Sequence, residues 1–227
     1  MNRRLEAIMA HIPQNGCGVI DVGTDHGYLP AALFQRGYTG KLIAADINAE
    51  PLSKAKRTAE SIGAEDVISL RLCDGLDGCD SSEVDTIVIA GMGGDTICGI
   101  LDRAEWCMAR EYTLILQPMT KCEILRYWLV YNEFEIISEE LVRDDRLYQI
   151  ITARFGGRQR LNDAELFTGS TALIGGDPLF PELRGKLERR FASAVDGMRE
   201  STETEIIDRR RLYEEILNQL RDMEGGR

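Results

Sequence analysis

The chain has 227 residues, of which 44% are hydrophobic and 29% charged, and its formal net charge is −11. This length fits one domain with an appendage or two small domains, and the composition is that of an ordinary soluble globular protein. Such acidity argues against a protein that coats itself in nucleic acid, although it leaves room for a local basic patch.

The sequence shows no sign of a membrane span, a secretory signal or a metal site. No apolar run approaches the ~20 residues of a membrane helix, and the N-terminal basic pair is not followed by a long apolar core. The six cysteines form no Cys-x-x-Cys motif and there are only two histidines, which argues against zinc. We therefore expect no membrane, no metal, a cytoplasmic location, and a monomer or weak homodimer.

After an amphipathic helix at 3–12, predicted strands and helices alternate along the chain. They fall at 19–22, 29–34, 41–47, 49–62, 67–72, 85–90, 95–104, 112–117 and 120–131. We expect Asn48 to cap the second of these helices and Thr120–Glu123 to form a capping box on the last. The alternation predicts a doubly wound α/β sheet with ligands at the carboxyl ends of its strands.

Two β-rich runs, 134–142 and 147–155, close this pattern. The link Arg143–Arg146 is so short that the two runs must form an antiparallel hairpin. A mainly parallel Rossmann-like sheet that ends in such a hairpin is the layout of class I methyltransferases, whereas nicotinamide-binding sheets are normally wholly parallel. We expect this domain to occupy residues 1–155.

Residues 156–227 are predicted to form a helical C-terminal arm. Two apolar stripes at helical spacing, between Leu183 and Met198 and between Ile206 and Met223, predict two helices that pair like a coiled coil. The arm is either a structural appendage or a contact for RNA or another partner. Its Arg and Lys clusters favour the second interpretation, but interleaved acids weaken it.

The loop after the first strand reads Asp21-Val-Gly-Thr-Asp-His-Gly27. Its two glycines permit positive φ and a close approach of the backbone to a ligand. The loop lacks the Gly-x-Gly-x-x-Gly pattern of dinucleotide sites, because Asp25 replaces the middle glycine and would repel a diphosphate. A carboxylate here suits a cationic ligand such as S-adenosylmethionine, and the alternative is a plain structural turn.

Acids and glycines also follow the next three strands. Asp46 ends the strand at 41–47, where an acid commonly accepts the hydroxyls of a ribose. Asp74-Gly75 follows the third strand, and Gly91–Gly94 follows the fourth and leaves the backbone bare. Each has a simpler interpretation as an exposed acid or a turn, and Met92 is either core or a base-stacking residue.

These motifs together resemble the bacterial family of tRNA adenine-22 N1-methyltransferases. The similarity rests on Asp21–Pro30, on Ala90-Gly-Met-Gly-Gly94, on Leu114-Ile-Leu-Gln-Pro118 and on the two-helix arm. That family often has Ser and Ala at the positions of Thr24 and Gly27. It usually has Asn after Gln-Pro, where this chain has Met119, and this difference bears on substrate and activity.

The resemblance implies S-adenosylmethionine as cofactor, tRNA as partner and methyl transfer to N1 of an adenine. It implies that Asp21 or Asp25 holds the amino group of the cofactor, Asp46 its ribose and Asp74 its adenine. Asp25, Tyr28 and Gln117 are the expected catalytic residues, although Tyr28 could be core and His26 could cap the following helix. The full expected cofactor set is Asp21, Gly23, Thr24, Asp25, His26, Gly27, Asp46, Ile47, Asp74, Gly75, Gly91, Met92 and Gly93.

Two alternatives stay open. The first is a nicotinamide-linked oxidoreductase, against which Asp25 argues. The second is a catalytically silent homologue that binds cofactor or tRNA, in which Met119 marks lost activity.

Overall fold

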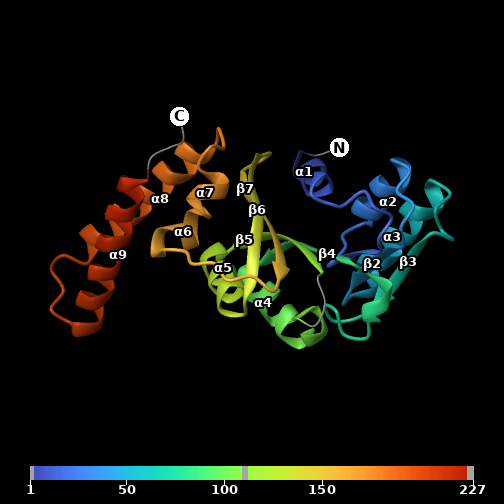
Figure 1. Ribbon diagram of the computed structural model, residues 1–227, viewed down its shortest axis with the longest axis horizontal. Coiled ribbons are helices and arrows are strands. Elements are labelled where there is room, and N and C mark those ends of the chain that lie inside the picture. The colour runs from blue at the N-terminus through green and yellow to red at the C-terminus, as the bar shows by residue number, and fades with distance from the viewer. Residues whose placement is uncertain (1–2, 109–111, 224–227) are drawn as a thin grey trace.

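A seven-stranded sheet forms the centre of the molecule, as the computed structural model in Figure 1 shows for residues 3–108 and 112–223. The strands and helices follow the chain as α1 (Arg3–Ala10), β1 (Val19–Val22), α2 (Tyr28–Gln35), β2 (Leu42–Asp46), α3 (Ala49–Ser61), β3 (Ile68–Leu72), β4 (Thr86–Gly93), α4 (Gly94–Arg103), β5 (Thr113–Thr120), α5 (Cys122–Tyr131), β6 (Phe134–Arg143), β7 (Leu147–Phe155), α6 (Asp163–Thr168), α7 (Thr171–Ile174), α8 (Phe180–Gly197) and α9 (Thr204–Asp222).

The strand order is β3-β2-β1-β4-β5-β7-β6. Strands β1 to β5 are parallel, and β7 runs antiparallel to both β5 and β6. This confirms the predicted mainly parallel sheet with its terminal hairpin. The order reverses between β1 and β4, so the carboxyl ends of these two strands flank the crevice where such sheets bind ligands.

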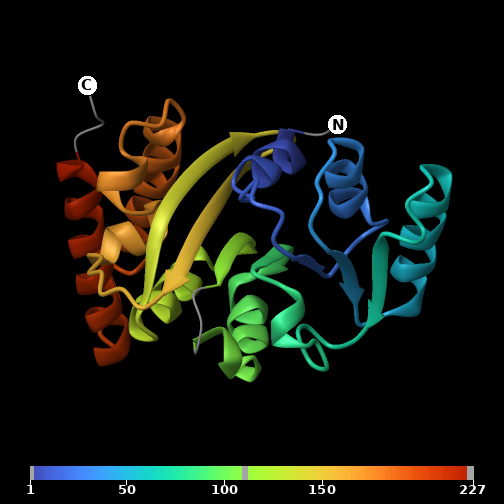
Figure 2. The same ribbon diagram turned by 45° about the vertical axis from the view of Figure 1, so that its right-hand side comes forward.

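Helices cover both faces of the sheet (Figure 2). Alternate residues of each strand point to opposite faces, so Ile20 and Ile43 pack under α4 and α5, whereas Val19 and Leu42 pack against α1, α2 and α3. Central strands that are buried on both sides need the continuous apolar runs that made them visible in the sequence.

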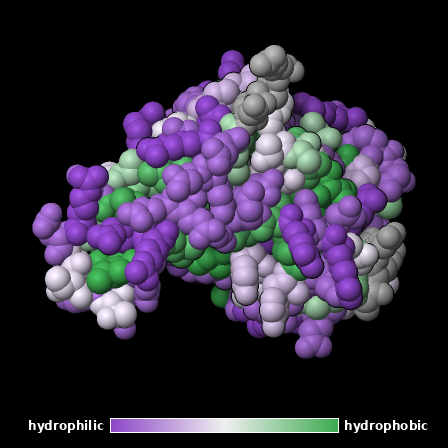
Figure 3. Space-filling model, turned by 60° about the vertical axis from the view of Figure 1, so that its left-hand side comes forward, coloured by the Kyte–Doolittle hydropathy of each residue, from purple (hydrophilic) through white to green (hydrophobic). Residues whose placement is uncertain are grey.

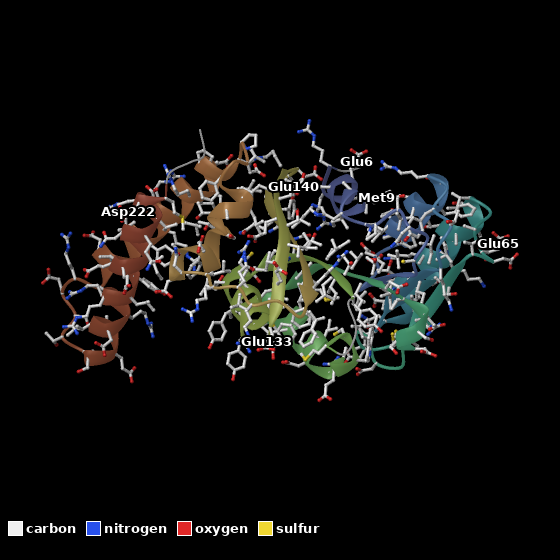
Figure 4. All side chains as sticks on the ribbon, viewed as in Figure 1. Glu6, Met9, Glu65, Glu133, Glu140 and Asp222 are labelled. Atoms are coloured by element: carbon white, nitrogen blue, oxygen red, sulfur yellow. The ribbon has the colours of Figure 1, made fainter. Side chains whose placement is uncertain are left out.

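The C-terminal helices build a third core beyond β6. Helices α8 and α9 pair along their length as predicted, and Phe191 packs edge-on against Phe167 and Tyr213. In Figure 4, Asp222 of this arm and Glu65 near β3 lie toward opposite ends of the molecule. Figure 3 shows that hydrophilic side chains cover most of one face, with hydrophobic ones visible between them. Among the described residues, no helix combines the length and apolar character needed to span a bilayer.

The predicted capping box at Thr120–Glu123 is wrong, whereas Asn48 does occupy the N-cap position of α3. Strand β5 continues to pair with β4 as far as Thr120, so this residue cannot cap, and α5 begins after Lys121 in the left-handed conformation at φ 56°. The side chain of Asn48 makes no cap bond at the start of α3. Instead, Oδ1 of Asp46 accepts a hydrogen bond from the Asn48 amide at 2.7 Å, which fixes the carboxylate at the strand end.

Candidate active site

The loop between β1 and α2 is tightly constrained. Gly23, His26 and Gly27 all have positive φ, of 75°, 63° and 66°. The amides of Gly23 and Thr24 both donate to the carbonyl of Ala45, at 2.8 and 2.9 Å. These two amides are therefore not available to a ligand, and Thr24, which is buried, acts in folding the loop.

Asp21 is the most perturbed carboxyl group of the site. Thr24 Oγ1 donates a hydrogen bond to Asp21 Oδ2 at 2.6 Å. Burial raises the pKa of Asp21 to about 6; the nearby Asp46 charge raises it further, and the Thr24 hydrogen bond opposes the shift. Asp21 lines a cavity at the end of β1 and makes no ion pair among the described residues, so its carboxyl group is suited to receive a cation.

Strand β4 is interrupted by a bulge at Gly91. The pairing with β5 passes from Ala90–Gln117 to Met92–Pro118, so Gly91 is an extra residue, with φ 84°. A side chain at this position would be strained, and the bare backbone faces the crevice between β1 and β4. The predicted glycine-rich segment is thus the end of a strand rather than a free turn.

A first cavity of about 510 Å³ lies at the ends of β1, β2 and β3, against α4. It contains seven of the residues expected to bind cofactor, and the ion pair of Asp74 with Arg103, at 2.9 Å, lies at its wall. Both side chains of this pair are about half exposed, so a ligand can displace it at little cost. The lining is Val22, Gly23, Asp46, Ile47, Asn48, Asp74, Gly75, Ala90, Gly91, Met92, Thr96, Gly99, Ile100 and Arg103.

A second cavity of about 430 Å³ adjoins the first and shares Gly23, Ala90 and Gly91 with it. Helix α1 supplies one wall, and Glu140 of β6 holds this helix by a 2.9 Å contact with His11. Figure 4 shows Glu140 next to the helix that carries Glu6 and Met9. The lining is Arg4, Leu5, Ile8, Asp21, Gly23, Asp25, Tyr28, Leu29, Ala90, Gly91 and Met119.

Tyr28 and His26 form a parallel ring pair at the edge of the second cavity. Their centroids lie 5.1 Å apart, and Tyr28 is 55% exposed, so it is not a core residue. His26 precedes the N-cap, Gly27, and its Nε2 lies 3.4 Å from Oδ1 of the exposed Asp25. An exposed aromatic face next to a carboxylate can receive a flat base that carries amino hydrogens.

Gln117 is completely buried and lines neither cavity. Its Nε2 donates to the Pro118 carbonyl at 2.9 Å, and its Oε1 accepts from Arg4 Nη1 at 3.2 Å. Gln117 can therefore orient Arg4, but its side chain is not presented to a substrate. Thr24, His26, Gly27 and Gly93 also lie outside both linings.

A third cavity of about 230 Å³ separates the end of β5 from α8 and shares Met119 with the second. Four basic side chains line it, together with the single acid Glu123. Lys121 is paired with Asp95 at 2.6 Å. The other three, which have no carboxylate partner among the described residues, are Arg146, Lys186 and Arg190.

Sequence reasoning missed the contributions of α1 and α4 to these cavities. Arg4 and Arg103 belong to amphipathic helices in which a single Arg carries no motif, so only the folded arrangement reveals them. Among the described residues, no group of three or more His, Cys, Asp or Glu is arranged to hold a metal ion.

Fold and cavities together define a Rossmann-like methyltransferase, and a model of the methyltransferase domain family matches residues 1–151. The tRNA (adenine(22)-N(1))-methyltransferase of Bacillus subtilis is 34% identical over 164 residues, which is 72% of this chain and 68% of the relative. The chain therefore belongs to the tRNA (adenine(22)-N(1))-methyltransferase family.

Solved structures agree along nearly the whole chain. The crystal structure of the B. subtilis m1A22 tRNA methyltransferase TrmK has a TM-score of 0.82 at 28% identity and covers 96% of this chain and 98% of its own. A Streptococcus pneumoniae candidate for the same activity, in complex with S-adenosyl-L-methionine, has a TM-score of 0.81 at 28% identity. It covers 96% of this chain and 99% of its own, so the C-terminal arm is part of the shared fold.

Proposed function

We propose that the protein transfers a methyl group from S-adenosylmethionine to N1 of an adenine in tRNA, at position 22 by relation to its family. The observation that carries the proposal is the pair of cavities that meet at Gly23, Ala90 and Gly91. One has the acids that a nucleoside donor needs, and the other opens beside it for an acceptor base. The assignment of tRNA as the substrate rests on family membership.

The residues in the first cavity support the assignment of S-adenosylmethionine. Asp46 would accept the ribose hydroxyls and Asp74 the adenine amine, with the backbone of Gly75 alongside. Met92 would contact the cofactor, since its Cε lies where a side chain at Gly23 would begin. S-adenosylmethionine held by these residues would supply an electrophilic methyl group on a positively charged sulfur.

The reaction needs little proton transfer. N1 of adenine has a free lone pair at neutral pH, provided that no Watson–Crick partner occupies it. The C–S bond breaks as the N–C bond forms, so positive charge moves from the sulfur to the adenine. Asp25, on the second cavity, would stabilise that charge and accept from the adenine amine, while Tyr28 stacks on the ring. In-line positioning supplies most of the rate, up to ~7–11 kcal/mol at the ideal limit.

The third cavity supports tRNA as the partner. Although the chain as a whole is acidic, this cavity has an excess of basic side chains, and it shares Met119 with the second cavity. Three of these basic side chains, Arg146, Lys186 and Arg190, make no ion pair among the described residues. Arg146 belongs to the sheet, whereas Lys186 and Arg190 belong to α8, so a phosphate backbone lying here would contact the arm as well as the sheet.

The test is methyl transfer from labelled S-adenosylmethionine to total tRNA, followed by nucleoside analysis. We expect 1-methyladenosine, and primer extension should stop at one adenine. Asp25→Asn should reduce kcat more than cofactor affinity. Methylation of protein or small amines but not of tRNA would overturn the substrate, and cofactor binding without turnover would identify a silent homologue.

Membership of a methyltransferase family argues against the alternative of a nicotinamide-linked oxidoreductase. The six free cysteines support the proposed cytoplasmic location, since thiols persist in a reducing compartment. A monomer or weak homodimer stays a prediction that sedimentation velocity would test.

A further inference from the structure

Arg4 is the one basic residue among the described residues that line the second cavity. It lies at the start of α1, and its guanidinium is held by three contacts: Gln117 Oε1 at 3.2 Å, Met119 Sδ at 3.8 Å and the face of the Tyr148 ring at 5.2 Å. The same guanidinium lies 4.0 Å from where a side chain at Gly91 would begin. It is therefore fixed next to the wall that the two cavities share.

The charges around Arg4 are unusual for a surface helix. Of the described residues that line the second cavity, Asp21 and Asp25 are acids and Arg4 alone is basic. The Arg4 side chain makes no ion pair with either acid, because its hydrogen bond goes to the neutral Gln117. Both of these donor contacts, to Gln117 and to Met119 Sδ, come from Nη1, so the donors on Nη2 and Nε remain for a ligand.

The donor that the proposed function requires has a matching charge pattern. Beyond its sulfonium, the methionyl end of S-adenosylmethionine carries an ammonium and a carboxylate on one carbon atom. A carboxylate that enters a cavity with two acids is repelled unless a cation receives it. A guanidinium fixed by neighbouring groups is well suited, because it can donate two parallel hydrogen bonds to the two carboxylate oxygens.

We propose that Arg4 binds the carboxylate of the methionyl group of S-adenosylmethionine while Asp21 binds its ammonium. The second cavity then contacts both charged groups of the methionyl end. Gln117 is then a positioning residue that holds Arg4 through its buried amide. This assignment rests on the proposed function for the identity of the donor. It leaves Asp25 and Tyr28, on the same cavity, for the acceptor base.

The test is calorimetry with two ligands that differ only at this group, S-adenosylmethionine and its decarboxylated form, which keeps the sulfonium and the amine. Wild-type protein should bind S-adenosylmethionine at least tenfold more tightly. Arg4→Gln, which retains a donor toward Gln117, should lose at least tenfold in affinity for S-adenosylmethionine and less than twofold for the decarboxylated ligand. Arg3→Gln changes the same charge on the exposed neighbouring position and should match wild type for both ligands.

Three outcomes would overturn the assignment: equal binding of both ligands by the wild type, unchanged affinity of Arg4→Gln for S-adenosylmethionine, or equal losses for both ligands. The first of these needs no variant, so the test holds even if Arg4→Gln folds poorly. Failure of the proposed function would look different, because the wild type would then bind neither ligand or would methylate no tRNA.

Discussion

At the scale of single residues, the raised pKa of Asp21 makes cofactor binding depend on pH. Burial is the main cause of the raised pKa of Asp21, which is about 6. The donor ammonium needs the ionised carboxylate, so affinity should be nearly constant above about pH 7, about half that value near pH 6 and about tenfold lower at pH 5. Calorimetry between pH 5 and pH 8 checks this. Asp21→Asn should bind weakly and without this pH dependence. Asp46→Asn should bind weakly and keep a pH dependence that is moved to lower pH, because the Asp46 charge helps to raise the pKa of Asp21.

The same shift predicts a stability change of opposite sense. A folded-state pKa of about 6 exceeds the ordinary 3.8, so the folded protein holds this proton more tightly than the unfolded chain does. Stability from Asp21 is therefore greatest at low pH and is lost as pH rises from about 4 to 6. Chemical denaturation of Asp21→Asn without ligand should give a free energy of unfolding at pH 8 that equals or exceeds that of the wild type. A large loss of unfolding free energy in this variant would contradict the raised pKa of Asp21.

Gly23 and Gly37 allow backbone strain to be separated from function. Both have positive φ, 75° and 78°, but a Cβ at Gly23 would lie 2.1 Å from Met92 Cε, while one at Gly37 meets nothing within 4 Å. Each change to Ala should cost about 1 kcal/mol of stability from the left-handed conformation. Only Gly23→Ala should also lose cofactor affinity, by more than tenfold, and equal affinities in a calorimetric comparison would count against the role of the shared wall.

At the scale of elements, a buried ion pair joins the sheet to the arm. Arg126 of α5 donates to Glu139 of β6 at 2.7 Å and to the carbonyl of Leu166 at 2.9 Å, while Glu139 accepts from the Ser170 amide at 2.6 Å. Neither charged side chain of the pair is exposed. These hydrogen bonds tie α6 and the segment after it to α5 and β6.

Removing one partner leaves the other charge buried. Arg126→Leu should therefore lower the free energy of unfolding in urea by about 3–5 kcal/mol. The matched control is Arg158→Leu, which breaks the pair with Glu133 at 3.2 Å, where Arg158 is 89% exposed. That change should cost under about 1 kcal/mol. Similar losses for the two variants would mean that the buried pair does not anchor the arm.

Helices and strands that are marked by a pattern of neighbouring residues could be predicted from the sequence. Apolar runs located five parallel strands, and the four-residue link located the hairpin. The capping box at Thr120 failed because pairing between β4 and β5 extends beyond the apolar runs that mark those strands. Neither the bulge at Gly91 nor the approach of Arg4 to Gln117 has a local signal, since each depends on residues far apart in the chain.

At the scale of the whole molecule, the three cavities adjoin one another along the carboxyl edge of the sheet. The first shares Gly23, Ala90 and Gly91 with the second, and the second shares Met119 with the third. Cofactor, acceptor base and RNA backbone would thus lie in sequence along the carboxyl edge of the sheet and across to α8. Met119 lines both the second and the third cavity, and its Sδ lies 3.8 Å from Nη1 of Arg4. Its change to Asn should therefore alter tRNA kinetics, and any accompanying change in cofactor affinity should disappear in an Arg4→Gln background.

The cations of the third cavity can be tested through salt. A phosphate contact releases counterions, so the logarithm of tRNA affinity should fall linearly with the logarithm of salt concentration, and losing one contact should reduce the slope by about 0.7–0.9. Lys186→Gln on α8 should show that reduction with cofactor affinity unchanged, because Lys186 lies outside the first two cavities.

The control is Arg57→Gln, which removes an exposed charge on α3, near the opposite end of the long axis, and should leave the slope of the salt dependence unchanged. Filter binding at several salt concentrations gives both slopes, and equal slopes for Lys186→Gln and wild type would place the RNA backbone elsewhere.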